Sequence, residues 1–134
     1  MDFKGLEVVK KIKEHDLKSI VLGTAIYSAD QGILSALVGC DYVAPYVNRM
    51  LNNNINPYEV ISSMRSFYDD RNLDCKIIAA SFKNTNQILN ALKAGAHSCT
   101  ISENLFLQMI NKDLAINAIK VFNNDGKKLD EITK

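Results

Sequence analysis

Tryptophan is absent from this sequence, and neither sign of charge predominates in it. The 134 residues carry 16 Lys and Arg against 15 Asp and Glu, so the formal net charge is +1. A chain without a basic or acidic excess lacks the field that draws proteins to nucleic acid or anionic membranes. It also lacks an apolar run of about 18 residues, and its first residues do not have the layout of a signal peptide. We therefore expect a cytoplasmic protein with no nucleic-acid or membrane partner.

Residues that bind metals or form disulfides are also scarce. The three cysteines, Cys40, Cys75 and Cys99, show no Cys-x-x-Cys spacing and lie in or beside predicted strands, which favours buried, reduced thiols. The two histidines, His15 and His97, are far apart and show no ligand spacing. No glycine-rich phosphate loop, Gly-x-Ser-x-Gly or His-Glu-x-x-His motif occurs. We expect neither a metal nor a cofactor.

What the sequence does contain is a strand–helix–strand pattern near its N-terminal end. Two β-branched and aromatic runs, at about Ser19–Tyr27 and Asp41–Val47, flank a helical pattern that opens at Ser28 and closes at Gly39. A helix between two strands implies a parallel sheet, because antiparallel neighbours need only a short turn. Ser28 and Gln31 have the spacing of a capping box, which gives Gln31 a structural role.

Part of this helix recurs later in the chain. The pattern Ile-Leu-x-Ala-Leu stands at Ile33–Leu37 and again at Ile88–Leu92, each time before a glycine and a strand. Such a repeat supports stacked strand–helix units. In the first copy we expect Ile33, Leu34 and Leu37 to face the core.

The same patterning extends over the rest of the chain. Helices are expected at about 4–15, 57–72, 84–95, 103–110 and 113–123, and strands at about 76–81 and 98–102. Asn48–Asn56 is interpreted as a polar loop, and Asn124–Lys134 as a polar tail that is either mobile or docked on a neighbour. We predict one α/β domain over residues 1–134, built as half of a β/α barrel, because a whole barrel needs about 200–250 residues.

Four motifs carry a resemblance to a known family. They are GTAIY at Gly23–Tyr27, QGILSAL at Gln31–Leu37, YVAPYVNR at Tyr42–Arg49 and AASFK at Ala79–Lys83. Over roughly residues 5 to 122 the sequence resembles the small transaldolase family, in particular its fructose-6-phosphate aldolase branch. The resemblance implies the C-terminal half of an eight-stranded β/α barrel and an activity in sugar-phosphate metabolism.

The resemblance also implies roles for four residues. Arg49 with Ser81 is expected to bind the phosphate of a sugar phosphate, since a guanidinium offers a planar fork of donors. Thr24 and Tyr46 are expected to hold the water that moves protons during carbon–carbon cleavage. A tyrosine at position 46 resembles the aldolase branch, whereas transaldolases proper usually carry phenylalanine there.

Each of these residues also has an ordinary structural interpretation. Arg49 could be a solvated arginine in an asparagine-rich loop, and Ser81 could cap a turn. Thr24 and Tyr46 are residue types that strands favour for packing alone.

The Schiff-base lysine of the family is not found in this sequence. In the family it stands in a Lys-Val/Ile-Pro motif on the fourth barrel strand, and the resemblance begins after that point. Most lysines here lie on predicted outer helices or in the tail, and Lys83, on the ligand-side rim, matches a rim residue of the family rather than its nucleophile. We therefore expect negligible aldolase activity from the chain alone.

A half barrel leaves strand edges and an inner face uncovered, so we do not expect a monomer. A homodimer or larger homo-oligomer, or a separately encoded N-terminal half-barrel chain, could cover them, and the strands could also pair flat between chains. Three functions remain open: an enzyme that needs a complementing half, a non-catalytic sugar-phosphate-binding module, and a structural remnant of a truncated gene.

Overall fold

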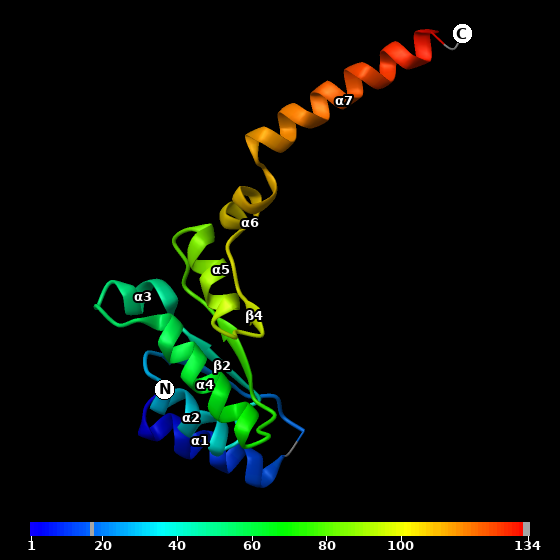
Figure 1. Cartoon of the computed structure of the whole chain (residues 1–134). Helices are drawn as coiled ribbons and strands as arrows, with labels where there is room; N and C mark the ends of the chain where they lie inside the picture. Colours follow the sequence, from blue (N-terminus) through cyan, green and yellow to red (C-terminus); the bar gives the residue numbers. More distant parts are fainter. Residues whose placement is uncertain (17, 133–134) are drawn as a thin grey trace. The chain divides into compact units, whose positions relative to one another are not determined.

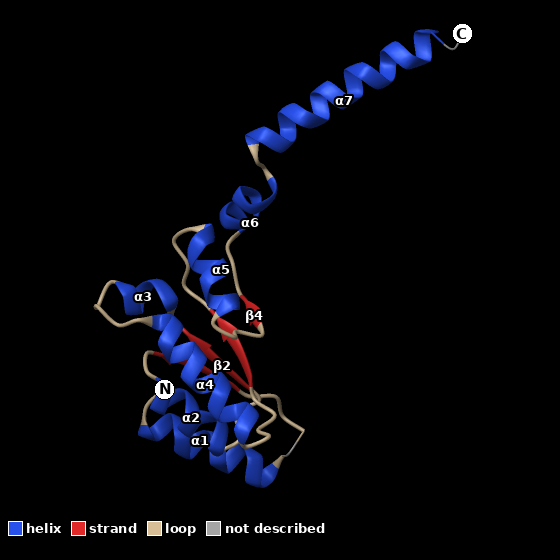
Figure 2. Cartoon of the chain, in the orientation of Figure 1, coloured by secondary structure: helices blue, strands red, loops and turns tan. Residues whose placement is uncertain are grey.

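Four parallel strands alternate with helices in the computed structural model, which describes residues 1–16 and 18–132 (Figures 1 and 2). The strands lie in the order β1-β2-β3-β4 and each neighbouring pair is parallel. Their bounds are β1 Leu22–Ile26, β2 Tyr42–Pro45, β3 Lys76–Ala79 and β4 Ser98–Cys99. The helices are α1 Phe3–His15, α2 Ala29–Leu37, α3 Val47–Leu51, α4 Pro57–Asp70, α5 Thr85–Lys93, α6 Glu103–Ile110 and α7 Asp113–Ile132. This is the partial β/α barrel that the sequence predicts.

The chain divides into two compact units, Met1–Ile101 and Ser102–Lys134. The first holds the whole sheet with α1 to α5, and the second holds α6 and α7. The prediction of one domain over the whole chain is not tested by this division and stays a prediction. No helix within the described residues is long and apolar enough to cross a membrane.

In the second unit, α7 is longer than predicted. The helix was expected to end at Asn123, but it continues through Gly126 to Ile132. One glycine in a helix costs only about 1 kcal/mol, and the lysines and leucine that follow are good helix formers. Lys128 also pairs with Asp125 at 3.7 Å, one turn earlier. The helix end predicted at Asn123 is therefore wrong. That the tail is mobile or docks on a neighbour stays a prediction, and residues 133–134 lie outside the described part.

In the first unit, the core lies between the sheet and the helices that cover it. The register aligns Gly23, Val43 and Ile77 across the first three strands. Val43 and Ile77 are fully buried, and they belong to one cluster with Ile61, Met64 and Tyr68 of α4. Continuous burial of this kind is typical of a parallel sheet covered by helices.

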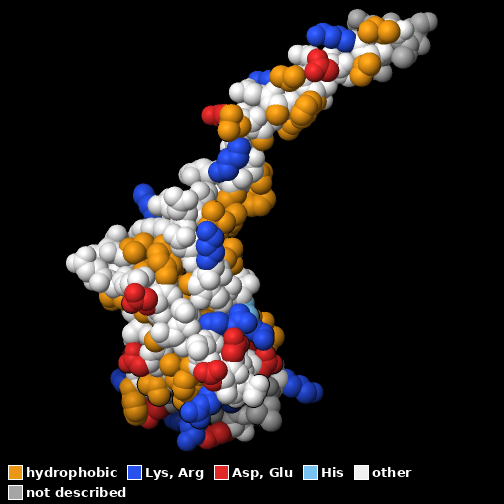
Figure 3. Space-filling model, viewed as in Figure 1, with side chains coloured by type: hydrophobic (Ala, Val, Ile, Leu, Met, Phe, Trp, Pro, Cys, Tyr) orange, Lys and Arg blue, Asp and Glu red, His pale blue; other side chains and the backbone are white. Residues whose placement is uncertain are grey.

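The face that α2 turns to the core is only partly the predicted one, because Ile33 packs against the core but Leu34 and Leu37 do not. Leu34 and Leu37 are 48% and 55% exposed, whereas Gly32, Ser35 and Ala36 are buried. A Cβ atom on Gly32 would collide with the thioether of Met64. Close approach of α4 therefore selects the smallest side chains of α2, and hydrophobic side chains gather instead on the surface over α1 and α2 (Figure 3).

Local signals at the helix ends are confirmed in most places. The side chain of Asn56 caps α4 and that of Asn84 caps α5, while Gly39 has the expected positive φ of 106°. Ser28 is the exception, because its hydroxyl makes no capping bond to the α2 backbone. It instead hydrogen-bonds Asp30 and lowers the pKa of that carboxyl.

The asparagine-rich segment after β2 is not a loop throughout. Its first residues form the short helix α3, in which Val47 and Met50 are fully buried. The strands are also shorter than the apolar runs that predicted them.

All three cysteines are free, as predicted, although Cys99 is only half-buried. Burial raises the pKa of Cys75 to about 12 and that of Cys99 to about 11. These thiols are therefore protonated and unreactive at neutral pH.

The environment of His97 is expected to make the stability of the fold depend on pH. The backbone N–H of Ile77 donates to its Nδ1 at 3.0 Å, and burial, with Arg65 and Lys76 nearby, lowers the pKa of His97 below 6.5 against an opposing effect of Asp69. The unfolded chain thus binds the proton more readily. The stabilisation is complete above about pH 6.5 and is lost as the pH falls toward the folded pKa.

We expect the free energy of unfolding in urea to fall between pH 7.5 and 5.5, and to fall less in His97→Gln. The matched control is His15→Gln, because Nδ1 of His15 lies 2.8 Å from the carbonyl of Lys11 in its own helix and, among the described residues, does not bond to another element. An equal pH dependence in wild type and His97→Gln would contradict this assignment.

Candidate functional site

Three of the predicted site residues lie in or just after three neighbouring strands, toward the end of each strand. Thr24 lies in β1, Tyr46 is the N-cap of α3 directly after β2, and Ser81 comes two residues after β3. Tyr46 and Ala80 form a parallel bridge. Since β1, β2 and β3 are adjacent and parallel, their carboxyl ends bring these residues to one edge of the sheet.

Thr24 and Tyr46 are in direct contact through their hydroxyl groups. The Thr24 Oγ1 and Tyr46 OH atoms are 3.0 Å apart, and either can be the donor. The backbone N–H of Tyr46 donates to the carbonyl of Ile26 at 3.1 Å, which fixes the start of α3 against β1. Because Thr24 is exposed and Tyr46 is half-buried, this pair of hydroxyls is open to a solvent molecule.

Arg49 lies over the same tyrosine. Its Cζ atom is 4.8 Å from the centroid of the Tyr46 ring, and its Nη1 donates to the hydroxyl of Tyr27 at 3.3 Å. The two tyrosine rings meet edge to face with centroids 5.8 Å apart. The bond to Tyr27 raises the pKa of Arg49, so the exposed guanidinium keeps its charge.

Tyr27 therefore joins the candidate site, although no role was predicted for it. Its ring follows β1 within the GTAIY motif, but only the structure brings it to Arg49. Gln31 fixes this turn, since its Oε1 accepts from the backbone N–H of Tyr27 at 2.9 Å. Gln31 thus has the structural role that was predicted, with a different donor from the one in a capping box.

Ser81 lies on a segment joined to the helix that carries Arg49. Its backbone φ is +62°, in the left-handed region that residues with a side chain rarely adopt. The backbone N–H of Asn48 donates to the Ser81 carbonyl at 2.7 Å, and that of Val47 donates to the Ala80 carbonyl at 2.8 Å. Arg49 and Ser81 thus occupy adjoining segments.

Lys83 occupies the rim after β3, as expected. Its side chain is exposed, and its backbone N–H donates to Oε1 of Gln87 at 2.6 Å. Lysines that form Schiff bases are buried or lie beside a second cation, and exposure does not provide that environment.

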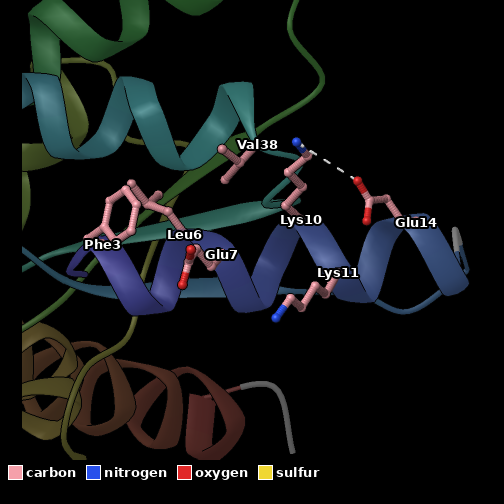
Figure 4. A pocket seen from close by; sticks show the side chains of 7 residues that line it. All are labelled: Phe3, Leu6, Glu7, Lys10, Lys11, Glu14 and Val38. Atoms are coloured by element: carbon pink, nitrogen blue, oxygen red, sulfur yellow. Dashed lines mark ion pairs between the residues drawn. The ribbon is translucent and has the colours of Figure 1, made fainter.

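Two hollows lie on the first unit, and one of them borders the candidate site. A cavity of about 590 Å³ beside α1 and β1 includes Thr24, Tyr27 and Gln31 in its lining. A separate groove of about 480 Å³ on α1 has none of the predicted site residues in its lining, which is shown in Figure 4 and contains the Lys10–Glu14 ion pair at 3.9 Å. Across residues 1–16 and 18–132, no three His, Cys, Asp or Glu side chains gather as a metal site would require.

Comparison with known protein families places this site in a wider context. The model of the family described as transaldolase/fructose-6-phosphate aldolase matches residues 3–134. This range includes both units and all four predicted site residues.

Proposed function

Because the chain belongs to the transaldolase/fructose-6-phosphate aldolase family, we propose that it binds a sugar phosphate at the carboxyl edge of β1, β2 and β3. The observation that carries this proposal is the arrangement of Arg49, which stacks on Tyr46 and is held by Tyr27 beside the Thr24–Tyr46 pair. A fixed, charged guanidinium next to two solvent-accessible hydroxyls suits a ligand that has both a phosphate and a polar carbon chain.

In this proposal Arg49 and Ser81 bind the phosphate. The stacking on Tyr46 and the bond to Tyr27 use one face and one nitrogen of Arg49, and a guanidinium has five N–H donors in all. The Ser81 hydroxyl adds a donor from the adjoining turn. A charged phosphate bound to an arginine fork forms hydrogen bonds that are about twice as strong as neutral ones.

Thr24 and Tyr46 then hold a water molecule for proton transfer. Their mutual bond of 3.0 Å leaves lone pairs and one hydroxyl proton for a third partner. A water between two hydroxyls and a substrate oxygen can take and return a proton during cleavage of a carbon–carbon bond. The tyrosine at position 46 favours aldol cleavage over transfer, by resemblance to the aldolase branch.

The amine for Schiff-base chemistry does not come from this sequence in our proposal. A lysine two residues before a proline would mark it, but Pro45 and Pro57 follow Val43 and Ile55 at that distance. The chain therefore binds without cleaving when it is alone. A non-catalytic sugar-phosphate-binding module is the second candidate, and the same observation favours it.

Catalysis would then need a partner that completes the barrel. In the order observed for residues 1–16 and 18–132, β1 and β4 are the outer strands and each has one edge without a partner strand. Two copies related by a twofold axis could pair β4 of each with β1 of the other and close eight strands. A complementing N-terminal half-barrel chain could use the same edges and bring the lysine. We expect one of these assemblies, in the cytoplasm.

Isothermal titration calorimetry on the purified chain tests the proposed binding. We expect saturable binding of fructose 6-phosphate, and binding of fructose at least about tenfold weaker, because fructose lacks the phosphate that Arg49 and Ser81 contact. Inorganic phosphate should compete with fructose 6-phosphate. Equal affinity for the two sugars would contradict the phosphate roles of Arg49 and Ser81, and binding of neither would leave the structural remnant as the better description.

A further inference from the structure

Gln87 is one of two polar side chains buried within the described residues, and it is 8% exposed. It lies in the first turn of α5, between the turn that carries Ser81 and the helix that carries Arg49. We infer that Gln87 is a positioning residue whose side-chain amide holds these two segments together. The inference rests on the proposed function, because it assigns Gln87 to the phosphate site.

Both ends of the Gln87 amide are used. Its Oε1 accepts from the backbone N–H of Lys83 at 2.6 Å, two residues beyond Ser81. Its Nε2 donates to Oδ1 of Asn48 at 3.0 Å, one residue before Arg49. One buried side chain thus bonds to the near neighbours of both proposed phosphate ligands, which are far apart in the sequence.

Asn48 is held from a second direction as well. Its backbone N–H donates to the carbonyl of Ser81 at 2.7 Å. Ser81 itself has the unfavourable φ of +62°, which persists only where surrounding bonds hold it. Gln87 bonds to Lys83 in this turn and to Asn48 in α3. It therefore fixes the geometry in which Ser81 and Arg49 contact one ligand. A site held in this way loses less conformational freedom when the ligand binds.

A second glutamine separates this role from simple helix capping. Gln31 has the same place in the first turn of α2, and its Oε1 likewise accepts from the backbone N–H just before the N-cap, that of Tyr27. Its Nε2 donates to the carbonyl of Met1 at 3.2 Å, not to a side chain beside a proposed ligand. Closing the first helical turn is therefore common to both glutamines, whereas the bond to Asn48 is specific to Gln87.

The test uses Gln87→Met, which keeps the length of the side chain and removes both hydrogen bonds. We expect it to weaken binding of fructose 6-phosphate in calorimetry by about tenfold, through the loss of pre-organisation. Asn48→Ala should weaken it similarly. If Gln87 acts through Asn48, the double variant should bind no more weakly than either single variant. The matched control is Gln108→Met, since Gln108 donates to Asn104 in an exposed amide pair on α6.

Each outcome decides between the two proposals. Wild-type affinity in Gln87→Met, or additive losses in the double variant, would overturn the positioning role and leave the proposed function standing. If the wild-type chain does not bind the sugar phosphate, the proposed function fails. Hydrogen exchange at the backbone N–H of Asn48 then tests whether Gln87 holds the two segments together. Faster exchange in Gln87→Met would then support the link between the segments, and unchanged exchange would overturn it.

Discussion

Replacing Arg49 with alanine is expected to weaken binding of fructose 6-phosphate by about a hundredfold, the largest loss expected from any single side chain. The estimate follows from charge-assisted hydrogen bonds, which are worth roughly 1.5–3 kcal/mol each where they form with a phosphate. Affinity for fructose should change little, because Arg49 meets only the phosphate in our proposal. Calorimetric titration of both sugars measures the two effects.

Two variants show whether charge, stacking or hydrogen-bond geometry is responsible. Arg49→Lys keeps the charge and loses the planar fork, so its affinity should lie between those of wild type and Arg49→Ala. Arg71→Ala is the matched control, since Arg71 also stacks on an aromatic ring, that of Phe67, with its Cζ 5.5 Å from the centroid. An equal loss in Arg71→Ala would attribute the effect to general stability or charge and contradict the assignment of Arg49.

The order of elements could be predicted because its signals are local. Asn56 followed by Pro57 indicates a helix start, and the structure has both at the start of α4. The bounds predicted for α6 were confirmed without change. Where a cap, a proline or a periodic pattern decides the structure, neighbouring residues are enough to reveal it.

The failures in the fold come from interactions between elements. The α2 face was predicted from hydrophobicity, but the space left by α4 admits Gly32 and not a leucine. The helix α3 was missed because its polar residues resemble a loop, whereas burial of Val47 and Met50 stabilises it. Neither contact can be read from the segment alone.

In the candidate site, too, local signals could be predicted from the sequence and contacts between elements could not. Ligands usually lie at the carboxyl ends of parallel strands. This rule and the family motifs predicted that one edge of the sheet carries the site, and the structure has these residues there: Thr24, Tyr46, Arg49 and Ser81. The bonds that position them join residues distant in sequence, such as Tyr27 with Arg49 and Asn48 with Gln87. A spacing rule does not contain such pairs, and only the folded backbone identifies them.

Borohydride trapping is expected to give no covalent adduct when the chain alone is incubated with fructose 6-phosphate. A Schiff base needs an amine that is nucleophilic at neutral pH, and our proposal assigns none to this chain. Two amines near the candidate site are the places where an adduct would be most expected, so they test this prediction most directly. Lys83 lies on the rim of the site, and the amino group of Met1 donates to the carbonyls of Thr24 and Ala25 at 2.9 and 3.1 Å. Intact mass with peptide mapping would detect an adduct on either, and such an adduct would contradict the proposal.

Addition of an N-terminal half barrel that carries the family lysine is expected to change this result completely. The adduct should then appear on that added lysine, and aldol cleavage should become measurable in a coupled assay. Tyr46→Phe in the mixture should lower the cleavage rate by roughly 10²–10⁴, the usual contribution of general acid–base catalysis. The adduct should still form, because the Tyr46 hydroxyl moves protons and is not the amine. Sugar-phosphate binding with neither adduct nor cleavage in the mixture would favour the non-catalytic binding module, since the site would then hold its ligand without a partner that can complete the chemistry.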